Sequence, residues 1–144
     1  MPGFLLDTNV ISGLAPDRSD QSGFASEDFR NWVVENEQQI FLSVITIAEI
    51  QAGIAALERR RATRRASALS QWLEALFSLY GNKVLPFTPA IALLTGTLLD
   101  KAIGSGIDPG FEDAAIAATA KFHDLTIVTN NLRHFQHFGV ALKR

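Results

Sequence analysis

Short apolar runs alternate along this chain with longer segments that have apolar residues at helical spacing. The runs expected to form strands are Phe4–Leu6, Ile40–Ile45, Val84–Leu85 and Leu125–Thr129, and residues 138–142 could add an edge strand. Apolar runs of this length are typical of strands buried on both faces. Strands that alternate with helices favour a parallel sheet covered by helices on both sides. The pattern therefore predicts an α/β fold, with three α/β/α layers around a central, mainly parallel sheet.

The intervening segments carry helix start and stop signals. We expect a short helix from Asn9 to Gly13, a loop over 16–23, and a helix capped by Ser26 whose apolar face includes Phe29, Trp32 and Val33. Thr46 is expected to cap a long helix that runs through Leu57. The next helix is expected to carry a cluster of arginines and to end at Gly81; its predicted apolar side is Leu69, Trp72, Leu73, Leu76 and Phe77.

Two further helices are expected in the second half of the chain. Pro89 suits the first turn of a helix that continues to Ile103. Glycine and proline residues then interrupt the pattern, and a helix is expected from Asp113 to His123.

Composition indicates one globular domain over residues 1–144. The chain is 47% hydrophobic, with 10 phenylalanines and no cysteine. The length suits a single domain, and the absence of cysteine excludes disulfides and thiolate metal sites. No secretory signal and no apolar run near 18 residues are present. We therefore expect a cytoplasmic protein that does not enter a membrane.

Three carboxylates, far apart in the sequence, each follow or adjoin a segment predicted to end at the same edge of the sheet. Asp7 follows the first apolar run, Glu49 comes shortly after the second, and Asp113 opens an alanine-rich segment; each is expected just beyond a buried strand. Ligands bind at the carboxyl ends of strands in open α/β sheets. At about 4 Å and an effective dielectric constant of about 20, each pair of acids would repel by roughly 4 kcal/mol. A hard divalent cation offsets such repulsion, so the sequence predicts a metal-dependent enzyme.

Each acid also has a purely structural interpretation. Asp7 suits a turn or helix cap. Thr46 and Glu49 match a capping box, in which the glutamate reaches back to the threonine amide. Asp113 would be favoured at a helix N-terminus in any case, and the neighbouring Glu112 is interpreted as a surface residue.

Other polar residues are candidates for lining the same pocket. They are Thr8, Asn9, Thr129, Asn131 and His134. No histidine has zinc-site spacing with a second ligand. A glycine-rich phosphate loop with lysine and a Gly-x-Ser-x-Gly elbow are both absent from the sequence, which argues against P-loop enzymes and serine hydrolases. A receiver domain would want a lysine where Asn130 and Asn131 stand.

A basic block lies in the middle of a chain whose formal net charge is −2. It consists of Arg59, Arg60, Arg61, Arg64 and Arg65. An acidic crevice with a separate basic patch is expected of a protein that binds and cuts a polyanion. A solvated helix face explains the arginines about equally well, so they are candidates for RNA contact and no more.

Four stretches together resemble the PIN-domain ribonucleases, and within them the VapC-type toxins of bacterial toxin–antitoxin pairs. These stretches are Leu5–Ser12, Ser43–Gly53, Asp113–Ala120 and Val128–Phe135. The resemblance implies a Mg²⁺ or Mn²⁺ ion held by Asp7, Glu49 and Asp113, and cleavage of an RNA phosphodiester by water. It places Thr8 and Thr129 in the pocket wall. It also implies a homodimer and a cognate antitoxin as a protein partner.

The chain departs from this family at one position. Many members have a fourth acid near the last motif, where this chain has His134. We therefore expect one firmly held ion and a second that is either weakly held or brought by the substrate. The alternative is an RNA-binding regulatory module whose degenerate site does not cleave.

Overall fold

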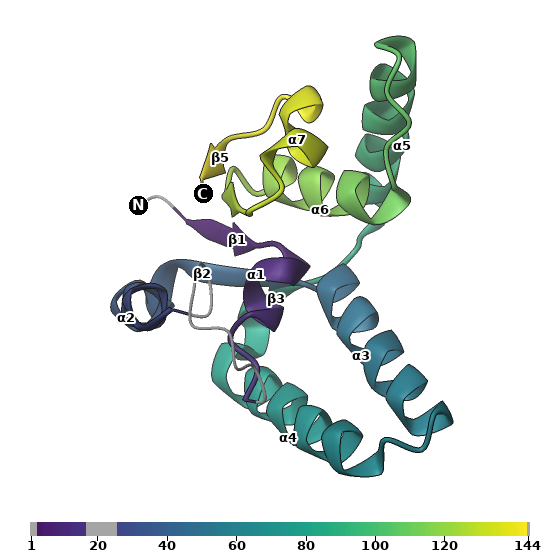
Figure 1. Cartoon of the computed structure of the whole chain (residues 1–144). Coiled ribbons are helices and arrows are strands. Elements are labelled where there is room, and N and C mark those ends of the chain that lie inside the picture. Colours follow the sequence, from purple (N-terminus) through teal and green to yellow (C-terminus); the bar gives the residue numbers. More distant parts are fainter. Residues whose placement is uncertain (1–2, 17–25, 144) are drawn as a thin grey trace.

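A five-stranded sheet forms the centre of the computed structural model, which describes residues 3–16 and 26–143 (Figure 1). Its strands are β1 (Phe4–Leu6), β2 (Ile40–Ser43), β3 (Val84–Leu85), β4 (Thr126–Val128) and β5 (Leu142–Lys143). Every pairing is parallel, in the order β3-β2-β1-β4-β5. This confirms the predicted α/β fold. The chain builds outward from β1 to β3 and later continues on the other side of β1, so the strand order reverses at β1. Ligands bind at such a reversal, beyond the carboxyl ends of the strands.

Seven α-helices and three 3-10 turns are found in the described part of the chain. The helices are α1 (Thr8–Ser12), α2 (Glu27–Glu35), α3 (Val44–Arg59), α4 (Thr63–Tyr80), α5 (Pro89–Gly104), α6 (Phe111–Phe122) and α7 (Leu132–Phe135), and the turns are η2 (Glu37–Gln39), η3 (Gly81–Lys83) and η4 (Gln136–Phe138). None of these helices is long and apolar enough to cross a membrane.

The sheet separates two apolar cores. Leu5 and Ile127 belong to the core under α5, α6 and α7, whereas Leu6 and Val128 belong to the core under α1, α3 and α4. Neighbouring strand residues point to opposite faces, so each short strand contributes to both cores. This explains why β1 and β4 are apolar without alternation.

The boundary between β2 and α3 differs from the prediction. The strand ends at Ser43, and its hydroxyl accepts a hydrogen bond from the Ile45 amide at 3.0 Å, which makes Ser43 the N-cap of α3. Thr46 was expected in that role, and this expectation is wrong, because Thr46 lies inside the helix and is fully buried. A continuous apolar run does not by itself distinguish the end of a buried strand from the first turn of a buried helix.

Smaller corrections concern helix faces and chain ends. Phe77 was predicted on the buried side of α4, but it is 47% exposed and lies outside the core. Leu73 and Leu76 are buried in the core, as predicted. The edge strand forms at Leu142–Lys143, while Phe138 is buried in η4. Ser26 caps α2 and Pro89 begins α5, as predicted.

The predicted loop and the basic block also need comment. Residues 17–23 of the predicted loop lie outside the described residues. The arginines are divided, since Arg59 ends α3 and only Arg64 and Arg65 lie in α4. The prediction that one helix carries them all is therefore wrong.

Candidate active site

Asp7 lies at the centre of the site, directly after β1 and at the start of α1. Its amide donates to the Val128 carbonyl at 3.0 Å, which continues the pairing with β4. One carboxylate oxygen, Oδ1, accepts from the Thr8 amide at 2.8 Å, and Oδ2 accepts from the Thr129 hydroxyl at 2.9 Å. Asp7 is only 4% exposed. Two neighbouring strand ends therefore fix the orientation of this carboxylate.

Glu49 reaches the site from α3 and is held by a chain of hydroxyl groups. The Thr8 hydroxyl donates to Oε1 of Glu49, and the Thr46 and Thr8 hydroxyls lie 3.0 Å apart. Because Ser43 caps the helix, the capping-box interpretation of Thr46 and Glu49 is wrong. Glu49 is oriented across the crevice by Thr8 of α1 instead.

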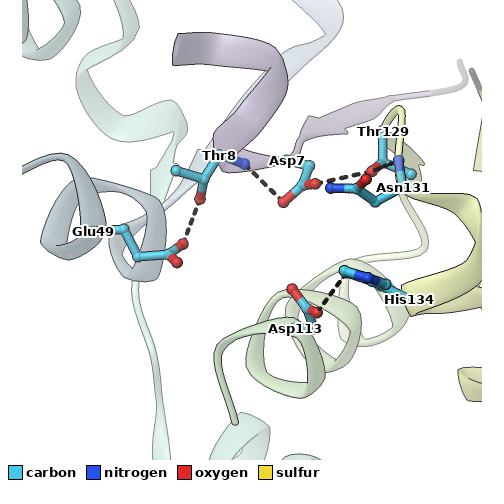
Figure 2. A network of polar contacts seen from close by, with 7 residues as sticks. All are labelled: Asp7, Thr8, Glu49, Asp113, Thr129, Asn131 and His134. Carbon is cyan, nitrogen blue, oxygen red and sulfur yellow. Dashed lines mark hydrogen bonds and ion pairs between the residues drawn. The ribbon is translucent and has the colours of Figure 1, made fainter. Parts of the chain in front are cut away.

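Asp113 approaches the crevice from the other core, in the first turn of α6. It does not follow a strand as predicted, because α5 and the turn after it separate α6 from β3. The side chain of Asp113 is 30% exposed, and its Oδ2 lies 3.4 Å from Nδ1 of His134 on α7. The prediction that Asp113 would be the residue facing the site is supported by this geometry. Figure 2 shows the three carboxylates pointing into one space, from the turn between β1 and α1, from α3 and from α6.

The crevice is electrostatically unfavourable for three ionised acids. Burial raises the pKa of Asp7, of Glu49 and of Asp113, and in each case this is the largest cause. Neighbouring negative charges raise each pKa further: that of Asp113 acts on Asp7, and Glu112 acts on both Glu49 and Asp113. Hydrogen bonds from Thr129 and Thr8 lower the pKa of Asp7, and the nearby His134 lowers that of Asp113. The site therefore has an excess of negative charge that a cation would relieve.

The oxygen donors suit a hard divalent ion. Among the described residues, no three acidic or histidine side chains lie close enough together to make a complete metal cage. Mg²⁺ does not require one, because it usually keeps several waters and binds through one or two carboxylates. Asp7, Glu49 and Asp113 therefore fit an ion that is bound partly through water.

The structure brings most of the predicted lining residues together. The carboxylates are surrounded by Thr8, Thr129, Asn131 and His134 (Figure 2). The backbone amide of Asn131 donates a hydrogen bond to the Thr129 hydroxyl at 2.9 Å. Asn9 is exposed on α1, and no described hydrogen bond joins its side chain to the acids. That placement gives no support to the prediction for Asn9.

Sequence reasoning missed two residues near the site. Thr46 supports Thr8 and thereby Glu49, and the only sequence signal was its position three residues before Glu49. His137 lies close enough to Asp113 to lower its pKa. No spacing pattern had identified His137, because its position depends on how η4 packs.

Two of the five arginines line a groove that leads away from the site. The groove, of about 290 Å³, begins at Thr8 and Glu49 and is lined further along by Arg60 and Arg65. Arg65 also lines a neighbouring hollow at the start of α4, together with Arg61 and Arg64. Arg59 lines neither depression.

The chain is similar to known proteins over nearly its whole length. The family model described as PIN domain matches residues 4–140. The chain is 32% identical over 139 residues to toxin FitB of Neisseria gonorrhoeae, covering 96% of this chain and 94% of that protein. It is 31% identical over 140 residues to VapC ribonuclease Y4jK of Sinorhizobium fredii, with 96% and 94% covered. The crystal structure of FitAcB from Neisseria gonorrhoeae superposes with a TM-score of 0.82 at 30% identity, covering 98% of this chain and 96% of that one.

Proposed function

The chain belongs to the PIN-domain family. We propose that it cleaves RNA with a Mg²⁺ or Mn²⁺ ion held by Asp7, Glu49 and Asp113. Relatives that match nearly its full length are named toxin and VapC ribonuclease. The chain is accordingly a VapC-type ribonuclease, the toxin of a toxin–antitoxin pair. The names of these relatives favour a cleaving enzyme over the binding-only module. The observation that carries the site assignment is that three acids from three elements, each with a raised pKa, face one crevice.

The chain's own residues divide the work of hydrolysis. Asp7 is held by hydrogen bonds from Thr8 and Thr129, so it would provide a fixed ligand for the ion, and Glu49, held by Thr8, would provide a second. When bound, the divalent ion would lower the pKa of a water molecule and polarise the scissile phosphate. Both oxygens of Asp7 already accept hydrogen bonds, whereas Asp113 is more open. Asp113 is therefore the better acceptor for the proton of the attacking water.

The RNA backbone would enter along the groove that leads from Glu49 to Arg60 and Arg65. The near end of this groove is acidic, and its far end carries the positive charge of the two arginines. Guanidinium groups bind phosphate oxygens in a bidentate manner. This supports Arg60 and Arg65 as RNA contacts and leaves the other three arginines without a comparable position.

The wider biology follows the family. A toxin of this type has an antitoxin as its partner. We further propose that the protein acts as a single cytoplasmic domain and pairs as a homodimer, in line with the resemblance of its sequence.

Asp113 and Glu74 form a pair for testing the site. Asp113→Asn should lower the rate of RNA cleavage at least about a hundredfold, the order expected when a general base or metal ligand is lost. Glu74→Gln removes an exposed carboxylate on α4, outside the site, and should retain most activity. Single-turnover cleavage of a defined RNA with Mn²⁺ measures both. Equal activity of the two variants would refute the assignment of Asp113.

A further inference from the structure

A second depression adjoins the acids on the side away from the arginine groove. It begins as a small cleft beside Asp113 and opens into a hollow of about 670 Å³. Ile107, Arg133 and His134 line both parts, so the two are continuous. Figure 2 shows His134 beside Asp113, where the depression meets the site. The hollow has the size of a small-molecule pocket, a class of about 300–1,000 Å³.

The lining of the hollow combines amide groups with apolar side chains. Asn130, Asn131 and Gln136 supply the amides, and Ile107 and Leu132 supply apolar surface. A side-chain amide presents a donor and an acceptor together, which is what the edge of a nucleobase requires. Proteins that read single-stranded RNA use unstacked bases in this way, with one face packed and one edge hydrogen-bonded.

The cleft that joins the hollow to Asp113 has polar groups suited to a sugar and a phosphate. Arg133 is exposed and lines both parts. His137 lines the cleft, and both of its ring nitrogens are shielded from solvent with no hydrogen-bond partner among the described residues. Because these nitrogens are closed to solvent, a nucleotide in the open cleft does not reach them. Arg133 is therefore the group in this lining that would meet the nucleotide backbone.

We propose that this depression is a nucleotide subsite of the ribonuclease. It would hold the nucleotide next to the scissile phosphate, with the base among Asn130, Asn131 and Gln136 and the backbone against Arg133. The subsite would thus make cleavage depend on the identity of one base flanking the cut, in an unpaired stretch of RNA. This inference rests on the proposed function.

The test compares base preference in wild type and in exposed variants of the hollow. Wild-type protein with Mn²⁺ is given a pool of single-stranded RNA oligonucleotides randomised on both sides of the cut, and the cleaved ends are sequenced. Asn130→Ala and Gln136→Ala should reduce the preference at one flanking position about tenfold, in the range expected for a lost base contact. Asn82→Ala and Gln71→Ala remove exposed amides on η3 and α4, outside the hollow, and should leave the preference unchanged.

Arg133→Ala should instead weaken cleavage of all sequences alike, as expected for a phosphate contact. Unchanged preference in both amide variants, or no preference in wild type at either flanking position, would overturn the subsite. If wild type cuts no RNA, the proposed function fails. The subsite is then decided by selecting the same pool for binding to Asp7→Asn protein with and without the Asn130 and Gln136 substitutions. Circular dichroism and thermal unfolding of each variant exclude loss of folding.

Discussion

Thr129 supports the central carboxylate from the end of a different strand. Its hydroxyl donates a hydrogen bond to Asp7 at 2.9 Å and accepts one from the backbone amide of Asn131 at 2.9 Å. The residue is fully buried. One hydroxyl therefore orients Asp7, the central acid of the proposed site, and fixes the turn that follows β4. The residue type was recognised in the sequence, but its double use depends on β1 and β4 being neighbours, which no local pattern encodes.

Replacing Thr129 tests that double role. Thr129→Val keeps the shape of the side chain but removes the hydroxyl, so the backbone amide of Asn131 and Oδ2 of Asp7 lose their hydrogen-bond partner. We expect a loss of about 1–3 kcal/mol in the free energy of unfolding and a marked fall in cleavage rate. Thr129→Ser keeps the hydroxyl and should retain most of both. Urea unfolding and cleavage kinetics measure the two effects; a valine variant as active as the serine variant would contradict this role.

The raised pKa of Asp7 predicts how the stability of the metal-free protein depends on pH. Burial raises the pKa of Asp7 in the folded state, so between its ordinary and its raised pKa the folded protein holds more protons than the unfolded chain. Stability then falls as pH rises through this interval. Asp7→Asn removes the charge and keeps a good helix cap. Without divalent ions, the variant should melt at a higher temperature than wild type at pH 7 and lose this advantage near pH 4. If the Asp7→Asn protein is less stable than wild type at pH 7, burial of the Asp7 charge does not destabilise the metal-free protein as this account requires.

At the scale of elements, the sequence predicted which segments form strands and helices better than where they meet. β1, β3 and the start of α5 lie where they were expected, because turn residues or prolines bound them. The β2–α3 junction was misplaced, since Ser43 is followed by two more apolar residues that belong to the helix. The route of Asp113 was also misjudged, because it depends on how α5 and α6 pack and not on a strand end.

Ser43 sets where α3 begins and therefore which side of the helix Glu49 occupies. Ser43→Ala removes the cap on the Ile45 amide and should reduce stability by about 1 kcal/mol. Ser43→Thr retains an oxygen acceptor and is the matched control. The Ser43 hydroxyl accepts its hydrogen bond from an amide in the first turn of α3. Hydrogen exchange of the first-turn amides therefore measures the loss of the cap directly. Unchanged exchange in the alanine variant would show that the cap is not what fixes the helix start.

Over the whole molecule, charge is arranged so that one groove runs from acids to arginines. Arg60 lies at its far end, although the chain as a whole carries a net charge of −2. Composition alone could not predict this arrangement, because the packing of α3 on α4 decides that Arg60 and Arg65 line the groove that starts at Glu49.

Arg60→Ala should weaken binding of single-stranded RNA by the Asp7→Asn protein. The slope of log affinity against log salt concentration should fall by about 0.7, the value expected for one lost phosphate contact. Lys121→Ala removes an exposed cation from the end of α6, outside the grooves, and is the control. Fluorescence anisotropy across a salt series measures both; identical slopes would remove Arg60 from the RNA path.

The central claim is that the three acids cut RNA with a divalent ion. The most direct measurement is cleavage of total cellular RNA by purified, antitoxin-free protein with Mg²⁺ or Mn²⁺, beside the Asp7→Asn variant and a chelator control. We predict discrete fragments that disappear in both controls. Fragments that persist in the Asp7→Asn variant or in the presence of chelator would contradict this assignment of the site.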